Sequence, residues 1–193
     1  MINSCIDREE VFGLVLLRNG AEEETEETIH RVGVTAKVIE VERLEGGRMN
    51  IVTEGERRFR IYRFTQQDPY WKASVDFFDD DERHQSIESF YEQVSELYRK
   101  VCELGARLGG SGDAASALPE SPSDLSYLVS YVLDIDSEGK QKLLEMASAA
   151  ERLQVLAGHL NDAIRKLEGQ LAYKELIGKV RGNGDLGKPH EES

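Results

Sequence analysis

The spacing of hydrophobic positions along the chain changes once, near residue 83, and we predict the main internal boundary there. Before it, apolar residues alternate with polar ones or form short runs, as in β-strands. After it, they recur every three or four residues, as on one face of an amphipathic helix. We therefore expect a β-rich domain over residues 1–82, a helical bundle over residues 83–177, and a polar, disordered tail over residues 178–193.

Five segments of the first part have the character of strands. The apolar run over residues 11–17 is typical of a strand buried on both faces. The alternation over residues 32–41 changes phase after Val38, which predicts a β-bulge. The other three strands are expected at residues 49–53, 57–64 and 71–78. Because helices are absent between most of these strands, we predict an α+β protein that begins with a small antiparallel barrel.

Turns and acidic segments separate these strands. Glycines predict tight turns at residues 45–48 and 54–56, since glycine readily adopts positive φ. Residues 21–28 contain five glutamates and are expected to form a solvated loop. The acidic run over residues 79–82 is expected to lead into a helix, whose N-terminus negative charges stabilise. A divalent-metal site in that run is the alternative.

The second part is expected to contain several helices. The apolar stripe over residues 87–102 predicts the first, which the glycines from Gly105 onward end. Ser121, followed by Pro122, predicts the start of the next. A short helix is expected over residues 137–147, and a long final one begins after a capping box at Ser148. The final helix buries a leucine stripe that includes Leu156 and Leu160.

Charge and composition restrict the partners and the compartment. The chain has 24 basic and 37 acidic residues, a net charge of -13 that repels phosphate backbones and anionic lipids. We therefore expect no membrane partner and disfavour nucleic acid. No apolar run reaches membrane-spanning length, and no secretory signal opens the chain. We expect a soluble, cytoplasmic protein in which Cys5 and Cys102 are reduced thiols.

Catalytic and cofactor motifs are absent from the sequence. The four histidines are far apart, and none forms a metal-binding motif with a neighbouring histidine or cysteine. No phosphate-binding loop follows a predicted strand. Cys102 lies on the apolar stripe of its helix, which favours a packed core thiol over a nucleophile. We therefore predict no catalytic residue, no cofactor and no metal, and expect that the chain is not an enzyme.

Several segments, taken together and in order, resemble the amino-terminal, substrate-binding domain of Lon protease. The family pattern has a strand beginning V-G-T-x-A-x-I, a glycine turn, a strand ending G-x-x-R-F-x-I, a P-Y-x-x-A-x-V segment, and Q-x-L-L-E and R-L positions. The corresponding residues here are 32–41, 46–48, 51–55, 57–61, 69–75, 141–145 and 152–153. The resemblance covers roughly residues 1 to 170. It implies a PUA-like pseudobarrel followed by a helical bundle.

In Lon proteases this domain recruits protein substrates and helps to assemble the hexamer, while later domains hydrolyse ATP and cleave peptides. The present sequence has neither an ATPase phosphate-binding loop nor the length for a protease domain. It thus resembles a stand-alone bacterial member of the family. Family members open with a P-L-F-P-L strand, whereas Met1 falls within the helix that follows it. We expect that the true start lies upstream, because a missing strand would leave an unpaired sheet edge; a sheet that lacks the strand is the alternative.

The resemblance and the missing chemistry predict a non-catalytic module that binds unfolded or exposed polypeptide segments. A protease or chaperone is a further candidate partner, and the oligomeric state is left open. If side chains alternate simply along residues 57–64, the aromatic side chains of Tyr62 and Phe64 point outward. By the same alternation, Phe78 points to the face of its strand that is opposite to the face of Trp71. We predict that Tyr62, Phe64 and Phe78 form an apolar peptide-binding patch. The alternative is that they pack beneath the helical bundle.

RNA binding is the rival function, because PUA-like barrels elsewhere bind RNA. Four arginines lie close together in the sequence and alternate with aromatic residues, as in many RNA-binding surfaces. These arginines are Arg57, Arg58, Arg60 and Arg63. The net charge of -13 opposes this function. Phosphate contacts would make binding steeply dependent on salt, unlike binding in an apolar groove.

Overall fold

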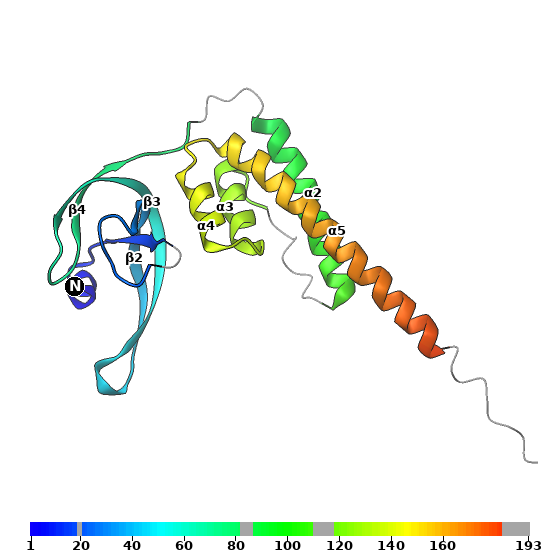
Figure 1. Ribbon diagram of the computed structural model, residues 1–193, viewed down its shortest axis with the longest axis horizontal. Helices are drawn as coiled ribbons and strands as arrows, with labels where there is room; N and C mark the ends of the chain where they lie inside the picture. The colour runs from blue at the N-terminus through cyan, green and yellow to red at the C-terminus, as the bar shows by residue number, and fades with distance from the viewer. Residues whose placement is uncertain (19–20, 82–86, 110–117, 183–193) are drawn as a thin grey trace, which may run out of the picture. The chain divides into compact units, whose positions relative to one another are not determined.

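The computed structural model describes residues 1–18, 21–81, 87–109 and 118–182, which divide into a sheet unit and a helical unit (Figure 1). The sheet unit comprises Met1–Asp81 and Ile135–Ser148, and the helical unit comprises Glu82–Asp134 and Ala149–Ser193. No helix in the described ranges has both the length and the apolar character needed to span a bilayer. Each unit is described by itself.

The sheet unit contains one antiparallel sheet, in which four strands lie side by side in chain order. A short helix, α1 (Ile2–Arg8), precedes it, and α4 (Ser137–Glu145) returns to it from later in the chain. The strands are β1 (Phe12–Leu17), β2 (Ile29–Arg43), β3 (Met49–Gln66) and β4 (Lys72–Phe77). β1 and β4 are therefore the two edges of the sheet.

The structure corrects two of the strand predictions. No turn forms at residues 54–56, because Glu54 pairs with Lys37 and Gly55 with Ala36, so the ladder between β2 and β3 continues through them. The described part of the chain thus has four strands where the pattern predicted five. β1 is an edge strand, and Leu14 is 45% exposed, so β1 is not buried on both faces.

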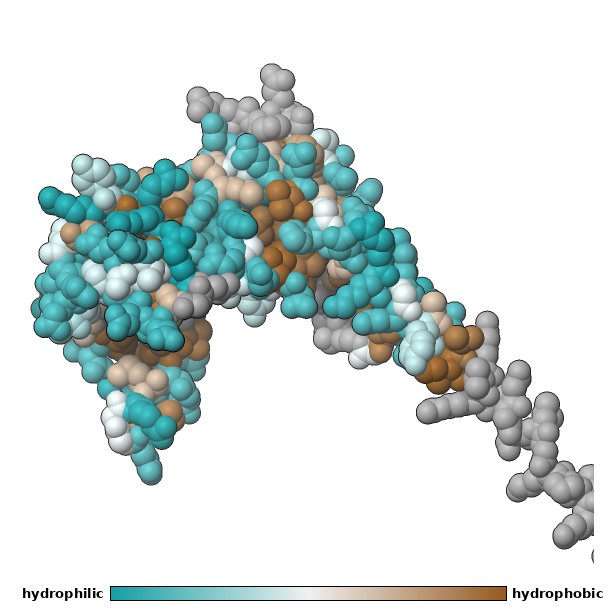
Figure 2. Space-filling view, in the orientation of Figure 1, coloured by the Kyte–Doolittle hydropathy of each residue, from teal (hydrophilic) through white to brown (hydrophobic). Residues whose placement is uncertain are grey.

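Two local predictions for β2 are confirmed. The pairing of β2 with β3 shifts between Val38 and Glu40, where the alternation changes phase. The turn between the two strands contains Gly46 and Gly47, both with positive φ, and forms the short 3-10 helix Glu45–Gly47. This end of β2 and β3 carries exposed hydrophobic residues among charged ones (Figure 2).

The core of the sheet unit lies on one face of the sheet. Ile29, Phe59 and Ile61 are buried there, and half-buried side chains of β1, β3 and β4 pack around them. The residues in this outer layer are Leu17, Phe64, Trp71, Ala73 and Val75. Because successive strand residues point to opposite faces, His30 and Arg58, the neighbours of Ile29 and Phe59, point away from this core.

α4 and the residues after it are held by these opposite-facing side chains. The amide of Gln141 donates to the Val32 carbonyl at 3.0 Å. The imidazole of His30 is buried, with Nε2 3.3 Å from a Glu138 carboxylate oxygen and Nδ1 3.4 Å from Oε1 of Glu145. Residues 135–148 therefore belong to the sheet unit in the structure, although the hydrophobic pattern placed them within a bundle over residues 83–177. That residues 1–82 and 83–177 fold as independent domains stays a prediction.

The buried guanidinium of Arg58 reinforces this attachment. It pairs with the buried carboxylate of Asp80 and donates to the carbonyls of Leu144 and Met146, at 3.0 and 2.5 Å. Next to it, the amide of Asp81 donates to the Ala147 carbonyl at 2.7 Å. These bonds fix the segment after β4 and the segment after α4 to each other and to β3.

The helical unit contains α2 (Ile87–Leu108), α3 (Pro122–Val132) and α5 (Ala149–Gly182). α2 and α5 lie side by side and run in the same direction, because Lys100 pairs with Glu168 and Arg107 with Glu175 (Figure 1). Their apolar stripes meet in a core of Leu104, Ile164 and Leu171, surrounded by half-buried leucines and Val101.

The helix ends agree with the sequence in part. Ser121 caps α3 by accepting a bond from the Asp124 amide, and Pro122 is the first helical residue, as predicted. Gly105 does not end α2, which continues to Leu108. α5 extends to Gly182, so the first residues of the predicted tail are helical. The rest of that tail, residues 183–193, lies outside the described residues.

A buried arginine joins α3 to α5. Arg152 is fully buried and donates to the Ser126 and Ser123 hydroxyls at 2.9 and 3.3 Å. Its guanidinium also lies 4.6 Å from the ring centre of Tyr127. On α2, burial raises the pKa of the Tyr98 phenol, and the neighbouring Cys102 raises it further. Cys5 and Cys102 are not joined by a disulfide; Cys5 is buried and Cys102 is half-buried.

We predict that Leu160→Asp disrupts the helical unit, because Leu160 is fully buried in α5 and a carboxylate there would lose its hydration. The expected loss of unfolding free energy is more than about 3 kcal/mol. Val155→Asp places the same charge on the same helix at a side chain that is 40% exposed, and is expected to cost less than about 1 kcal/mol. Urea unfolding followed by circular dichroism checks both. Equal midpoints for the two variants would contradict the assignment of this core.

Candidate functional site: an apolar hollow in the sheet

An open hollow of about 330 Å³ lies on the core-bearing face of the sheet; we call it the sheet hollow. Two of its walls come from the two edge strands. β1 contributes alternate residues Gly13, Val15 and Leu17, and β4 contributes Ala73 and Val75. Because alternate residues of a strand share one face, the sheet must curve to bring both edges to the same hollow.

The floor of the sheet hollow is the ring of Phe59, which lies close to two glycines. A Cβ atom at Gly33 would lie 2.3 Å from the carbonyl oxygen of Leu14 and 2.7 Å from Cζ of Phe59. A Cβ atom at Gly13 would lie 3.0 Å from that same Cζ. Glycine at these positions therefore makes room for the ring, the usual reason for glycine inside a strand.

Aromatic and charged side chains also line the hollow. Phe64 and Trp71 pack with ring centres 4.9 Å apart and planes tilted by 59°. The guanidinium of Arg31 lies 4.8 Å from the centre of the Phe64 ring. Glu24 and Lys72 bring one charge of each sign to the lining. The hollow can thus accept an apolar side chain while charged groups remain near water at its opening.

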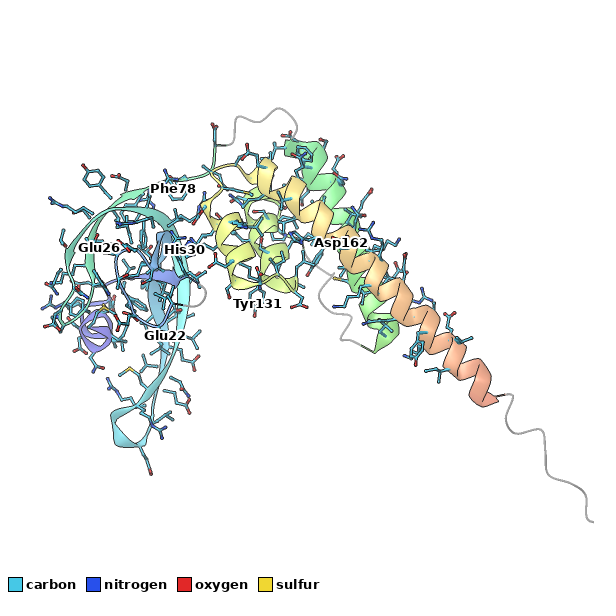
Figure 3. All side chains as sticks on the ribbon, in the orientation of Figure 1. Glu22, Glu26, His30, Phe78, Tyr131 and Asp162 are labelled. Atoms are coloured by element: carbon cyan, nitrogen blue, oxygen red, sulfur yellow. The ribbon has the colours of Figure 1, made fainter. Side chains whose placement is uncertain are left out.

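The loop between β1 and β2 is acidic and locally ordered; we call residues 21–28 the acidic loop. The Thr25 amide donates to the Thr28 hydroxyl at 2.8 Å, and that hydroxyl lies 2.8 Å from the Glu23 carbonyl, to which it donates. At its root, the Arg18 amide donates to the Thr28 carbonyl at 2.8 Å. All five glutamates of the loop are exposed, and Glu22 and Glu26 are labelled in Figure 3. Only Glu24 lines the hollow itself.

The structure does not bring the three predicted binding residues together. Tyr62 is 76% exposed and points outward, as expected from alternation. Phe64 packs instead with Phe59 and Ile61 on the core face, so its predicted outward orientation is wrong. The pairing of β3 with β4 shifts between Ile61 and Arg63, and this irregularity moves Phe64 to the opposite face.

Phe78, the third predicted residue, is half-buried against arginines. The guanidinium groups of Arg58 and Arg60 lie 4.5 and 5.3 Å from its ring centre. The contacts that cover Phe64 and Phe78 thus come from their own unit. Whether Tyr62, Phe64 or Phe78 contacts a partner stays a prediction.

Three of the four arginines behind the RNA hypothesis, Arg57, Arg58 and Arg60, have contacts within the sheet unit. Arg58 is buried on Asp80, and Arg57 lies 3.7 Å from the Asp79 carboxylate and 4.6 Å from the ring centre of Phe77. Asp79 and Asp80 belong to the acidic run over residues 79–82, for which a metal site was the alternative, and both are engaged by these arginines. Among the described residues, no group of three or more histidine, cysteine, aspartate or glutamate side chains is arranged to hold a metal ion.

The hydrophobic pattern alone did not reveal the sheet hollow. The sequence feature that indicates the hollow is a pair of glycines, Gly13 and Gly33, each inside a segment with strand character. They lie in adjacent strands, near a ring from a third strand. Only the pairing of the strands brings these three residues together.

The chain is thus an α+β protein with an apolar hollow in an antiparallel sheet. The family model described as the ATP-dependent protease La (LON) substrate-binding domain matches residues 1–162. The chain therefore belongs to the LON substrate-binding domain family.

Relatives and solved structures agree with this assignment. The chain is 26% identical over 174 residues to a Lon protease of Syntrophus aciditrophicus, covering 87% of the chain and 22% of that protein. It is 28% identical over 188 residues to Lon protease 2 of Myxococcus xanthus, covering 94% of the chain and 22% of that protein. The chain therefore spans about a fifth of the length of these relatives.

Two solved structures share the fold. The amino-terminal domain of Lon protease from the Mycobacterium avium complex has a TM-score of 0.58 at 24% identity, over 78% of this chain and 77% of that one. A Lon N-terminal domain protein from Xanthomonas campestris has a TM-score of 0.56 at 17% identity, over 81% and 80%. At these identities the likeness supports the fold alone.

We predict that Gly33→Ala destabilises the sheet unit by about 1 to 3 kcal/mol, because the added methyl group would overlap the Leu14 carbonyl and the Phe59 ring. The matched variant is Gly55→Ala, where the nearest atom to a new Cβ lies 3.4 Å away. It should be neutral or stabilising by up to about 1 kcal/mol, since alanine restricts the unfolded chain. Urea melts of both variants test this. A Gly33→Ala protein as stable as Gly55→Ala would contradict the close packing of the hollow floor.

Proposed function

We propose that this chain is a non-catalytic protein-binding module, and that the sheet hollow receives apolar side chains from unfolded or otherwise exposed polypeptide segments. The observation that carries the proposal is an open apolar hollow in a chain of the LON substrate-binding domain family. The partner is a polypeptide, and the catalytic steps of proteolysis belong to other proteins or domains.

The size and lining of the hollow support a side-chain ligand. A volume of about 330 Å³ is at the lower end of the range for ligand pockets, and suits one or two large apolar side chains. Burial of one such side chain contributes about 1.5 to 3 kcal/mol. A single contact of this kind gives weak binding, so useful affinity requires several contacts along one extended segment.

This mode of binding would distinguish unfolded from folded clients. Large apolar side chains are mostly buried in folded proteins and become accessible on unfolding. A hollow that accepts them needs no base, nucleophile or cofactor. The family match supports this division of labour, because the matched domain is described by substrate binding. A protease or a chaperone that acts on the captured segment is the partner class that we propose for the module.

We predict that Val15→Asp weakens capture of an unfolded client by about tenfold or more, because it places a carboxylate in the wall of the sheet hollow. The matched control is Ile39→Asp, which replaces another exposed β-branched residue of the same sheet outside the hollow lining. Both side chains are already well exposed, at 39% and 58%, so both variants should stay within about 1 kcal/mol of the parent.

The measurement is fluorescence anisotropy with a labelled, reduced and alkylated model protein that cannot refold. Ala73→Asp, on the opposite wall, provides a second test of the same hollow. Unchanged capture by both hollow variants, with both folded, would overturn the proposal. Equal loss in Ile39→Asp would show that charge anywhere on the sheet is sufficient and would also overturn it.

The three aromatic residues are expected to behave differently from one another. Tyr62→Ser should change stability by less than about 1 kcal/mol, since this side chain is exposed. Phe64→Ser and Phe78→Ser should each cost about 2 kcal/mol or more, because both rings pack within the unit. Denaturant melts measure these losses. If client capture falls in a stable Tyr62→Ser variant, binding extends beyond the hollow; equal stability of all three variants would contradict the packing described above.

A further inference from the structure

The imidazole of His30 is buried between β2 and α4, and each of its ring nitrogens faces a carboxylate; His30 is labelled in Figure 3. Nε2 lies 3.3 Å from each carboxylate oxygen of Glu138, and Nδ1 lies 3.4 Å from Oε1 of Glu145. The His30 side chain is 8% exposed, whereas those of Glu138 and Glu145 are 28% and 41% exposed. The ring is therefore shielded from water, while both carboxylates can still reach it.

The spacing of polar residues along α4 explains why this contact forms. Glu138, Gln141 and Glu145 are three and four positions apart, so they lie on one face of the helix. Besides its bond to the Val32 carbonyl, the Gln141 amide donates to Oε1 of Glu145 at 2.9 Å. That bond fixes the oxygen that faces Nδ1 of His30. One face of α4 thus meets β2 through groups that are held in position.

The charge state of His30 decides whether both contacts are favourable. A neutral imidazole has one N–H donor and one nitrogen that can only accept, so it can donate to one carboxylate and turns a lone pair toward the other. The imidazolium has a donor at both nitrogens, and its positive charge attracts both glutamates. The arrangement around His30 therefore fits the doubly protonated ring.

Other charged groups near this contact come from β3 and α4. On β3, Arg58 pairs with Asp80, and the Arg60 guanidinium lies on an aromatic ring. β1, the other neighbour of β2, has no charged side chain. On α4, Lys142 is exposed, and helical spacing directs Lys140 away from the face that meets β2. Within the described ranges, His30 is thus the group at the centre of this contact that can gain or lose a proton near neutral pH.

We propose that His30 is a pH-sensitive switch: the imidazolium holds α4 on β2, and loss of its second proton to solvent loosens that attachment. The attached helix favours the ring with one proton more, so attachment strengthens as the pH falls and weakens as the pH rises. This switch goes beyond the proposed function, because it acts on the face of the sheet opposite to the sheet hollow.

The two ends of α4 should respond differently to the loss of that proton. Arg58 donates to the carbonyls of Leu144 and Met146, and a guanidinium keeps its charge at any pH near neutral. The carboxyl end of α4 therefore stays attached and serves as a hinge. The part of the helix before it, which includes Glu138 and Gln141, opens and uncovers the Val32 carbonyl.

The first test measures the protonation of His30 by NMR of the ring nitrogens in the full chain. At about pH 7, the doubly protonated fraction of His30 should fall at least about twofold in Glu145→Gln and in Glu138→Gln, since each removes a negative charge beside the ring. The matched control is Glu56→Gln, which removes the same charge at an exposed position of β3. The control should leave the fraction unchanged.

The second test measures amide hydrogen exchange of α4 at about pH 6 and about pH 8, with each rate divided by the intrinsic rate at that pH. In the parent, protection of α4 should fall about three- to tenfold relative to that of α5. His30→Gln should abolish this extra loss, because glutamine does not titrate. His159→Gln, at an exposed position of α5, should retain it. Should His30→Gln not fold, Glu145→Gln is expected to reduce the loss.

Three results would overturn the proposal. The first is a neutral His30 ring in the parent at about pH 6. The second is protection of α4 that changes in parallel with that of α5 between the two pH values. The third is an equal change of His30 protonation in Glu56→Gln and Glu145→Gln, which would show that net charge alone decides.

Discussion

The buried pair of Arg58 and Asp80 is the interaction on which the sheet unit depends. Removing both charges from water is costly, and the bonds from the guanidinium to the carbonyl groups of Leu144 and Met146 help to offset that cost. Those bonds bring a segment from more than 80 positions later in the sequence onto β3. The sheet unit is therefore discontinuous in sequence. It is complete only when residues 135–148 have come back to the sheet, after the chain has passed through α2 and α3.

This attachment makes the two faces of the sheet unequal. His30 and Arg58 hold α4 and the segment after it, while their sequence neighbours Ile29 and Phe59 point to the other face. One face is thus held by a distant part of the chain, and the other carries the sheet hollow. The proposed binding of apolar side chains uses this second face, while the first is occupied by the chain's own α4 segment.

Local patterns were reliable where a single element decides the outcome. The capping of α3 by Ser121, the bulge after Val38 and the turn at Gly46 all follow from residues that lie within a few positions of one another. The pattern failed where a partner strand decides. Residues 54–56 contain a glycine and look like a turn, but β2 is long enough to pair with them and keeps the strand extended. Phe64 changed faces because pairing with β4 is irregular after Ile61.

The sequence by itself determined the α+β class, the strands followed by helices, the absence of catalytic motifs and the resemblance to the family, since each depends on local spacing and composition. The tertiary structure alone decided which apolar residues form the hollow and which segment covers the opposite face. Gly13, Gly33 and Phe59 come from three strands, and their contact depends on register. Register is a property of paired strands, and a shift of one residue moves every side chain to the other face.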